Sequence, residues 1–570
     1  MLNHLYTKQG RALPEIPHNT YPRPALKRAS FFCLNGSWDF CVVESERKID
    51  YNEKIVVPFA PESLLSGINR TFKEGTLFCY RREFSLPEGF VKARVILNFG
   101  AVNQQAKIIL NGELIGKHSG GYTPFSFDIT SLLRIHNTLE IIAKNDFDSF
   151  VFPYGKQCRK RGGMWYTAAS GIWQSVWLES VSENYIKDVK ITADMYKASF
   201  EISGADEGEI IINTPEGEVN IPFGRGRASY KPESPCNWSP ENPYLYYCTV
   251  ISGEDRVETY FALRSLEIGK INGVPRTMLN GKPYFFHGLL DQGYFSDGIF
   301  TPAAPELFEQ DIKTAKSLGF NMLRKHIKIE PQQFYYDCDR LGMVVFQDMV
   351  NNGKYSFLRD TALPTIGVKR LPAFLLGRTK EQKQEFYNAL KETVELLWNH
   401  PSVCCYTIFN EGWGQFDEED MYLRIKMMKT GRLIDTASGW FKTDKNDFES
   451  LHVYFKKIKI KPSSKPIFLS EFGGYSFKPK NHVFNTEKTY GYKMFDNKKE
   501  FQKAFISLYE NEVIPAIKTG LCATVYTQLT DVEDETNGLI SCDREVVKVN
   551  KDKLKALSQK IFNEFAKITK

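Results

Sequence analysis

Two glutamates at the ends of apolar runs are the residues best suited to chemistry. The run YTIFNEGWG, residues 406–414, carries Asn410 and Glu411. A second run, IFLSEFGG at residues 467–474, carries Glu471. Burial penalises the charged form of a carboxylate, so a glutamate at the tip of a buried strand is costly unless it has a task. Paired carboxylates across a sugar-binding cleft can cleave a glycosidic bond, because one protonates the leaving oxygen while the other attacks or activates water.

Each glutamate also has a purely structural interpretation. Asn410 followed by an acidic residue suits the N-terminus of a helix, and Glu471 could form a buried ion pair with an arginine. A helix cap explains neither the second glutamate nor the strand-like context of both. We therefore predict an acid/base pair.

Length and charge bound the kind of protein. A chain of 570 residues is too long for one core and predicts three or four domains of about 150 residues each. Its 74 basic and 68 acidic residues are spread along the chain, so we expect neither nucleic acid nor a membrane as a partner. Aromatic residues make up 14%, which suits rings stacked beneath sugars and equally suits β-rich cores.

The cysteines and the first residues bear on location and cofactors. The eleven cysteines show no regular spacing, and Cys404, Cys405 and Cys522 sit in apolar runs, so we expect free thiols in a reducing compartment. The first residues lack the apolar segment of a signal peptide, which predicts a cytoplasmic location. CxxC, HExxH and strand-linked GxGxxG motifs are absent from the sequence, so we expect no metal and no cofactor.

Turn-separated β-rich runs fill the first half of the chain. Residues 1–181 contain runs such as ARVILNF at 93–99, divided by turn signals such as Asn111-Gly112, and predict a β-sandwich. Residues 182–267 carry further strands over a length suited to one immunoglobulin-like sandwich.

Residues 268–570 change to a helical period between apolar strands. Residues 305–319 open with a proline, close on a glycine and predict an amphipathic helix. Continuous apolar strands alternating with helices over about 300 residues predict a (β/α)8 barrel, in which chemistry lies at the C-terminal ends of the strands. Glu411 and Glu471 fall at such ends. Three further polar side chains do so as well: Arg324, His326 and Asp348.

Seven segments along the chain carry a family resemblance. They are LNGSWDF (34–40), YRREF (80–84), VNQQAKIILNGELIGKHSGGYTPFSFDIT (102–130), SGIWQSVWLE (170–179), GFNMLRKH (319–326), NHPSVCCYTIFNEGWG (399–414) and LSEFGG (469–474). Together they resemble glycoside hydrolase family 2, which includes β-galactosidases, β-glucuronidases and β-mannosidases. The resemblance implies an N-terminal jelly-roll sandwich, an immunoglobulin-like domain and a catalytic TIM barrel. It also implies a retaining exo-β-glycosidase acting on a glycoside or oligosaccharide, with Glu411 as acid/base and Glu471 as nucleophile.

Several side chains near the pair are candidates for binding. The amide of Asn410 could hydrogen-bond the sugar 2-hydroxyl. His326 could bond a sugar hydroxyl or be a structural histidine, and Arg324 is better placed to orient Glu471 than to touch substrate. Tyr454 resembles the family tyrosine that bonds the nucleophile, with a core tyrosine as the alternative.

Three further candidates have equally simple structural alternatives. Trp413 and Tyr526 could be stacking walls of the cleft or packing residues. Asp291 could bind two adjacent hydroxyls or be an ordinary exposed loop aspartate.

The glycone is predicted by departures from the family. β-Glucuronidases carry Asn-x-Lys after the last barrel strand, but residues 531–545 contain no lysine, and Asn497-Lys498-Lys499 precedes Glu500 at capping-box spacing and predicts a helix start. Glucuronide is disfavoured, although the basic run 156–161 could reach a uronate. β-Mannosidases usually show a Trp-Gly element where this chain has Arg324-Lys325-His326, so a mannoside is disfavoured as well. A galactose-configured substrate remains, and galacturonide and arabinopyranoside fit the same shape.

Three functional hypotheses stay open at this point. The first is a retaining exo-β-glycosidase. The second is a catalytically silent carbohydrate-binding protein. The third is that the sandwich domains build a homo-oligomer interface that walls the active site.

Overall fold

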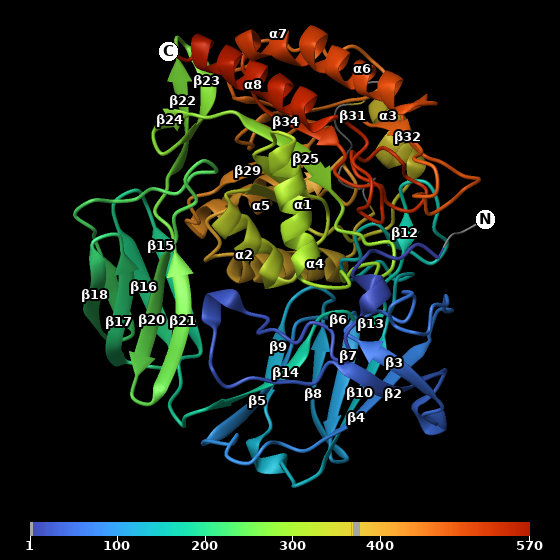
Figure 1. Cartoon of the computed structure of the whole chain (residues 1–570), viewed down its shortest axis with the longest axis vertical. Coiled ribbons are helices and arrows are strands. Elements are labelled where there is room, and N and C mark those ends of the chain that lie inside the picture. Colours follow the sequence, from blue (N-terminus) through green and yellow to red (C-terminus); the bar gives the residue numbers. More distant parts are fainter. Residues whose placement is uncertain (1–3, 366–367, 369–376) are drawn as a thin grey trace.

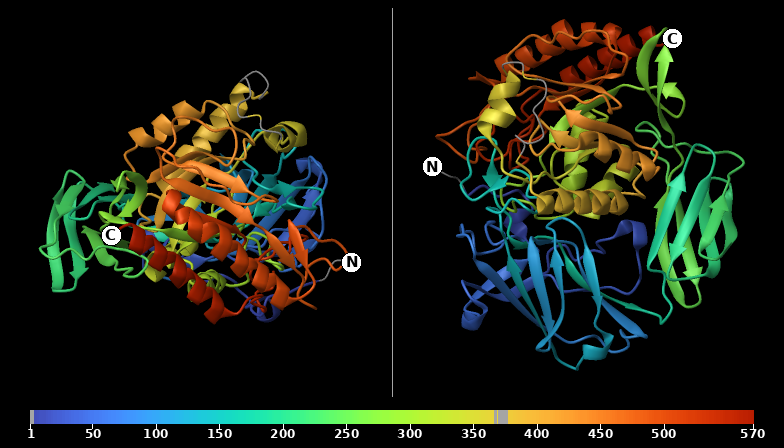
Figure 2. Two further views of the ribbon diagram at one scale, coloured as in Figure 1. Left: turned by 90° about the horizontal axis from the view of Figure 1, so that it is seen from above. Right: turned by 180° about the vertical axis from the view of Figure 1, so that it is seen from behind.

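The computed structural model describes residues 4–365, 368 and 377–570. A blue N-terminal lobe and a green sheet flank a yellow-to-red barrel (Figure 1). The views from above and behind show the same three parts, with the green sheet at the side of the barrel (Figure 2). Among the described residues, no helix is long and apolar enough to cross a membrane. The eleven cysteines are free, as expected from their spacing.

The N-terminal lobe is a β-sandwich. Its two antiparallel sheets have the strand orders β1-β14-β5-β9 and β3-β2-β4-β10-β7-β8. Trp38 and Ile141 of one sheet pack with Leu97 and Leu178 of the other in a single core, which confirms the predicted sandwich. The strands are β1 (Phe32–Cys33), β2 (Gly36–Val43), β3 (Glu53–Val57), β4 (Leu77–Phe84), β5 (Arg94–Phe99), β7 (Gln105–Leu110), β8 (Glu113–Ser119), β9 (Phe125–Asp128), β10 (Asn137–Lys144) and β14 (Val176–Val181), with the short β6 (Val102–Asn103), β11 (Gln157–Cys158), β12 (Tyr166–Thr167) and β13 (Gly171–Ile172).

The middle segment forms one antiparallel sheet in the order β15-β16-β19-β18-β17-β20-β21. Phe200 near one edge and Val257 near the other belong to the same hydrophobic cluster, so the two halves of the sheet pack on each other. The immunoglobulin-like topology and the domain boundaries remain predictions. The strands are β15 (Asp188–Ala193), β16 (Ala198–Ser203), β17 (Glu207–Thr214), β18 (Gly217–Gly224), β19 (Arg227–Tyr230), β20 (Tyr246–Ser252) and β21 (Asp255–Phe261). A small antiparallel sheet leads to the barrel: β22 (Leu266–Ile271), β23 (Val274–Leu279) and β24 (Lys282–Pro283).

Eight parallel strands form the barrel, in the order β29-β28-β27-β26-β25-β34-β31-β30. The two end strands approach through side chains, because Ser450 donates a hydrogen bond of 2.8 Å to Asp435. All C-terminal ends therefore meet at one face. The strands are β25 (Phe286–Asp291), β26 (Met322–Lys325), β27 (Val344–Asp348), β28 (Val403–Asn410), β29 (Leu433–Ser438), β30 (Glu449–Val453), β31 (Ile467–Gly473) and β34 (Leu521–Thr527). A pair of short strands, β32 (Tyr475–Phe477) and β33 (Lys493–Phe495), lies beyond β31.

Helices cover most of the barrel. The helix predicted over 305–319 is α1, and Asn497 accepts a hydrogen bond from the backbone N–H of Glu500, which confirms its role as a helix start. The regular (β/α)8 prediction was wrong in one respect, because segments 439–448 and 454–466 contain no helix. The helices are α1 (Glu306–Ser317), α2 (Gln332–Leu341), α3 (Leu363–Thr365), α4 (Lys380–Leu396), α5 (Glu418–Met427), α6 (Lys498–Leu508), α7 (Ile514–Ala516) and α8 (Lys551–Ile568).

Candidate active site

Glu411 and Glu471 meet at the C-terminal face of the barrel. Glu411 directly follows β28, the fourth barrel strand along the chain, and Glu471 lies in β31, the seventh. One oxygen of each carboxylate and one nitrogen of His452 all lie within 4.8 Å of one another. Asn410 and Tyr454 line the same pocket.

The guanidinium of Arg324 lies beneath the pair and organises it. Arg324 is fully buried and donates to Asp348 at 2.9 Å and to Glu471 at 3.1 Å. It also donates to the side-chain oxygen of Asn410 at 2.8 Å. Because a guanidinium has only donors, Asn410 must turn its oxygen toward Arg324. The amide nitrogen of Asn410 is thereby left to face the pocket.

The environment of Glu471 favours its ionised form. Burial alone would raise the pKa of this carboxyl, but the cations around it, foremost the Arg324 guanidinium, outweigh that penalty and hold the pKa below its ordinary value. The hydroxyl of Tyr454 donates to the other carboxylate oxygen at 2.6 Å. Both oxygens are thus held in place, and the carboxylate is charged at neutral pH.

His452 holds Glu411. The Nδ1 atom of His452 lies 2.8 Å from Glu411 Oε1, and its Nε2 atom lies 3.5 Å from the Nη1 donor of Arg324 and 3.1 Å from the hydroxyl of Ser438. Since Arg324 can only donate, Nε2 is the acceptor, and Nδ1 carries the proton that bonds Glu411. A Cβ on Gly439, whose φ is +83°, would lie 2.5 Å from the imidazole, so glycine makes room for the ring.

The helix-cap interpretation of Asn410-Glu411 was wrong. Asn410 is the last residue of β28, Glu411 has a φ of +52°, and helix α5 begins only at Glu418. The backbone N–H of Glu411 donates to the carbonyl of Ser438 at 3.0 Å. This turn aims the Glu411 side chain toward His452, where it stays partly exposed.

His326 is a neutral acceptor at the pocket wall. Its Nδ1 atom lies 2.7 Å from Asp348, which can only accept when ionised, so Nδ1 carries the proton and Nε2 is free to accept. Burial, more than its charged neighbours, lowers the pKa of this imidazole well below its ordinary value. A hydroxyl donor of a ligand would suit Nε2.

Two predicted substrate contacts lie outside the pocket. Tyr526 is fully buried against the helices, and its hydroxyl accepts from the backbone N–H of Tyr475 at 3.1 Å. Asp291 accepts from Lys325 at 2.6 Å on the outer face of the barrel. The strand alternation explains both errors, because the neighbouring residues Leu290 and Thr527 line the pocket instead.

Trp413 does line the pocket. Its indole nitrogen donates to the carbonyl of Gly353 at 3.1 Å, and its ring meets that of Trp165 edge to face at 5.2 Å. The two rings form an aromatic wall contributed by both the barrel and the sandwich.

Several pocket residues were missed in the sequence. Tyr492 stacks on Tyr454 with ring centroids 3.8 Å apart, and Glu535 lies in the loop after β34. Trp165 reaches the pocket from the N-terminal sandwich. So does Lys156, the first residue of the basic run 156–161, whose reach to a uronate the sequence had suggested. The sequence carries no local signal for Tyr492, Glu535 or Trp165. The position of His452, two residues before Tyr454 at the end of β30, was a usable signal, because alternate residues of an extended segment share a face.

Two groups of side chains have donor atoms close enough to hold a metal ion, within the described ranges. One is Glu411, His452 and Glu471, and the other is His482, Asp543 and Glu545. In the first group His452 already hydrogen-bonds Glu411 at 2.8 Å, and in the second His482 lies 2.7 Å from Asp543. Both groups are explained equally well as clusters of hydrogen-bonded side chains and as metal sites.

The fold and the site together define a class of protein. A parallel barrel with two carboxylates facing each other at the ends of its fourth and seventh strands, joined to a β-sandwich, is the framework of a barrel glycosidase. The model of the glycosyl hydrolases family 2 TIM barrel domain matches residues 274–560. The model of the glycosyl hydrolase 2 galactose-binding domain-like region matches residues 62–166. The chain belongs to glycoside hydrolase family 2.

Curated relatives divide between two sugar specificities. A β-galactosidase of Thermoanaerobacter pseudethanolicus is 25% identical over 436 residues, which cover 71% of this chain and 54% of the relative. A β-glucuronidase of Streptococcus agalactiae is 25% identical over 416 residues, covering 68% of this chain and 67% of the relative. The chain thus matches only about half of the length of the first.

Solved structures show the same fold. A family 2 β-galacturonidase of Eisenbergiella tayi, bound to galacturonate, superimposes with a TM-score of 0.67 at 18% identity, covering 95% of this chain and 99% of that one. A β-D-glucuronidase of Dictyoglomus thermophilum superimposes with a TM-score of 0.73 at 18% identity, covering 95% and 98%.

Proposed function

We propose that this protein is a retaining β-glycosidase in which Glu411 is the acid/base and Glu471 the nucleophile. The observation that carries the proposal is the approach of the two carboxylates, whose oxygens lie within 4.8 Å. Retaining enzymes place their carboxyl groups about 5–5.5 Å apart, whereas inverting enzymes need about 6.5–9.5 Å to admit a water between sugar and base.

The surrounding contacts suit two different roles for the carboxylates. Glu471 is kept ionised and is held at both oxygens by Arg324 and Tyr454, so it can attack the anomeric carbon and form a glycosyl ester. Glu411, held at one oxygen by His452, protonates the leaving oxygen from the other. In the second step Glu411 takes a proton from water, which attacks the ester and releases the sugar. The free amide of Asn410 donates to the 2-hydroxyl.

The glycone has two candidates. A galactose-configured neutral sugar follows from the sequence. A uronide is favoured by Lys156, which lines the pocket and forms no ion pair with any described residue. Its ammonium is 5.8 Å from the centroid of the Tyr166 ring. Its charge acts to lower the pKa of Glu471 and of Glu535, although it forms no ion pair with either. An unpaired cation in this position suits a substrate carboxylate.

Hydrolysis of a panel of p-nitrophenyl glycosides tests the proposal. The panel contains the β-galactoside, β-galacturonide, β-glucuronide, β-glucoside, β-mannoside and α-L-arabinopyranoside, each assayed with wild type and with Glu471→Gln. Release from one glycone that disappears in the variant supports the glycosidase and names its sugar. Turnover that survives in Glu471→Gln refutes the nucleophile. Binding without turnover across the panel supports the carbohydrate-binding alternative.

A further inference from the structure

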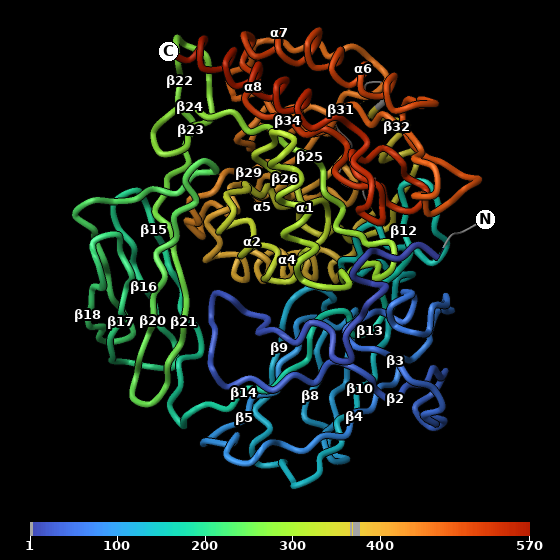
Figure 3. Tube along the Cα trace, viewed as in Figure 1, coloured from blue at the N-terminus to red at the C-terminus, as the bar shows by residue number. Residues whose placement is uncertain are grey.

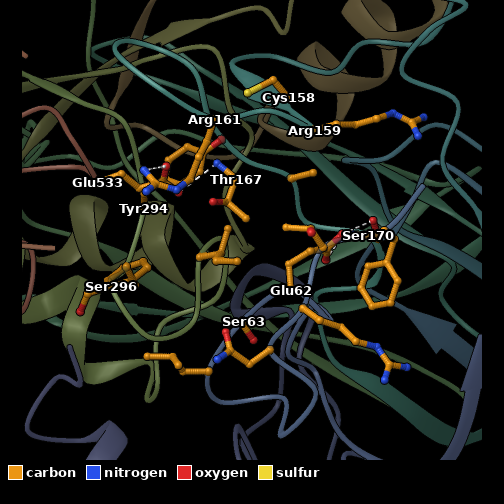
Figure 4. A pocket seen from close by; sticks show the side chains of 18 of the residues that line it. Glu62, Ser63, Cys158, Arg159, Arg161, Thr167, Ser170, Tyr294, Ser296 and Glu533 are labelled. Carbon is orange, nitrogen blue, oxygen red and sulfur yellow. Dashed lines mark hydrogen bonds and ion pairs between the residues drawn. The ribbon is translucent and has the colours of Figure 1, made fainter. Parts of the chain in front are cut away.

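A second cavity lies between the N-terminal sandwich and the barrel. Its volume is about 490 Å³, which is within the usual range of small-molecule sites. The loop before β4 and residues 158–170 line it from the sandwich, and the loops after β25 and β34 line it from the barrel. None of its lining residues belongs to the pocket that holds Glu411 and Glu471. Figure 4 shows these side chains converging from both domains.

Glu62 is a buried carboxyl in this cavity that the proposed reaction does not use. It is 8% exposed and accepts from the backbone N–H of Ser170 at 3.0 Å and from the Ser170 hydroxyl. No lysine or arginine of the described chain forms an ion pair with it, and burial raises its pKa to about 7. A carboxyl kept in such surroundings is costly and is typical of functional sites. Two of its four acceptor positions remain open.

Two residues that line the cavity carry hydroxyls without a partner among the described residues. Tyr294 is 6% exposed, and its hydroxyl forms no hydrogen bond within the described part of the chain. The same holds for the hydroxyl of Ser296. Buried polar groups are nearly always satisfied, so these two hydroxyls are available to a polar ligand of the cavity.

The arginines that line the cavity are each paired with a carboxylate, Arg70 with Glu53 among them, and the remaining cation, Lys73, is exposed to solvent. Arg161 pairs with Asp534 at 3.0 Å, and Arg159 pairs with Glu74. An anionic ligand is therefore not required for charge balance. The rings of Phe72, Phe147 and Phe484 add apolar faces to the lining. Aromatic faces, hydroxyls and an unpaired carboxyl together suit a polyhydroxylated ring.

A short loop separates this cavity from the catalytic pocket. On the cavity side Glu533 accepts from the backbone N–H of Thr167 at 2.9 Å. Two residues later, Glu535 lines the catalytic pocket and accepts from the hydroxyl of Tyr166. The tube in Figure 3 shows the red segment after β34 descending beside β12, where this contact forms.

We propose that the cavity is a second carbohydrate-binding site that takes a neutral sugar ring, with Glu62 accepting from adjacent hydroxyls and Tyr294 and Ser296 bonding the rest. The ligand is a free monosaccharide or one unit of a glycan chain, which share this chemistry. The site stands independently of the catalytic assignment, since it uses none of the catalytic residues.

Calorimetric titration tests the proposal on full-length protein. Galactose, glucose and arabinose, and then the disaccharides lactose and cellobiose, are titrated into Glu471→Gln, which prevents turnover. Glu62→Ala and Tyr294→Phe are added to that background, with the exposed Glu83→Ala of the same sandwich as the matched control. Tyr294→Phe removes one oxygen only, so it keeps the test valid if Glu62→Ala unfolds.

We expect at least one sugar to bind at two sites per chain. Glu62→Ala and Tyr294→Phe weaken one of these events by about tenfold or more, while Glu83→Ala changes neither. Tighter binding of a disaccharide indicates a glycan chain, and equal binding indicates a free sugar. In the otherwise wild-type enzyme, neither cavity substitution changes nitrophenyl glycoside turnover without added sugar. A single binding event, or a second event unaffected by both substitutions, overturns the proposal.

Discussion

Removing the imidazole of His452 should impair proton donation while sparing nucleophilic attack. His452 donates to Glu411 at 2.8 Å, and its nearest approach to Glu471 is longer, at 3.7 Å. A hydrogen bond to a charged group contributes about 1.5–3 kcal/mol. Each 1.36 kcal/mol is tenfold in rate, so His452→Leu should lower acid-assisted cleavage about 10- to 150-fold.

The assay compares leaving groups at neutral pH, where Glu471 is ionised. The kcat/KM for a phenyl glycoside depends on protonation of the leaving oxygen, whereas a 2,4-dinitrophenyl glycoside leaves without it. We expect the full loss for the phenyl glycoside and nearly unchanged kcat/KM for the dinitrophenyl glycoside. His452→Asn, which can place an amide donor near the position of Nδ1, should restore most of the activity. Equal losses for both leaving groups would refute the role of His452 in holding Glu411.

Three further outcomes follow from the same contacts. Tyr454→Phe removes the donor to Glu471 at 2.6 Å, so it should lower kcat/KM by about tenfold or more for both leaving groups equally; a loss confined to the phenyl glycoside would contradict that. Lys156→Met should weaken cleavage of a uronide by about tenfold or more while sparing a neutral galactoside, and the exposed Lys160→Met should change neither; equal effects on both sugars would exclude Lys156 as the carboxylate partner. Glu62→Gln should raise the free energy of unfolding more at pH 8 than at pH 5, by up to about 3 kcal/mol, and the thermal unfolding midpoint should rise accordingly. The sign follows because a raised carboxyl pKa makes the native state hold more protons than the unfolded chain between the ordinary pKa and about 7, so stability falls as pH rises through that window. An equal gain at both pH values would contradict the raised pKa.

Local periodicity was sufficient to predict the barrel and the positions of its two glutamates. Apolar strands between helices predicted where β28 and β31 end, and parallel strands bring such ends to one face. The same rule failed for two predicted substrate contacts, because each lies one position along its strand from a residue that faces the pocket. Asp291 and Tyr526 follow and precede pocket-lining residues, and a single step along a strand turns a side chain to the opposite face.

Most contacts between domains were beyond the reach of local patterns, although the basic run 156–161 had suggested that Lys156 could reach a uronate. Lys156 and Trp165 belong to sandwich loops, yet they line the pocket of a barrel whose strands begin more than a hundred residues later. Their placement depends on how the two domains dock, which no period of 2 or 3.6 residues encodes. The strand periodicity also did not reveal that the connections between β29, β30 and β31 contain no helix. The strand order itself is regular.

The configuration of a glycosyl azide tests the central claim most directly. Glu471→Ala and Glu411→Ala are each incubated with the 2,4-dinitrophenyl glycoside of the preferred sugar and sodium azide, and the product is identified by proton NMR. We predict the inverted α-azide from Glu471→Ala, because azide replaces the missing nucleophile, and the retained β-azide from Glu411→Ala, because azide attacks the glycosyl ester on Glu471. The opposite pairing, or a β-azide from both variants, would contradict the assignment of Glu471 as the nucleophile and Glu411 as the acid/base.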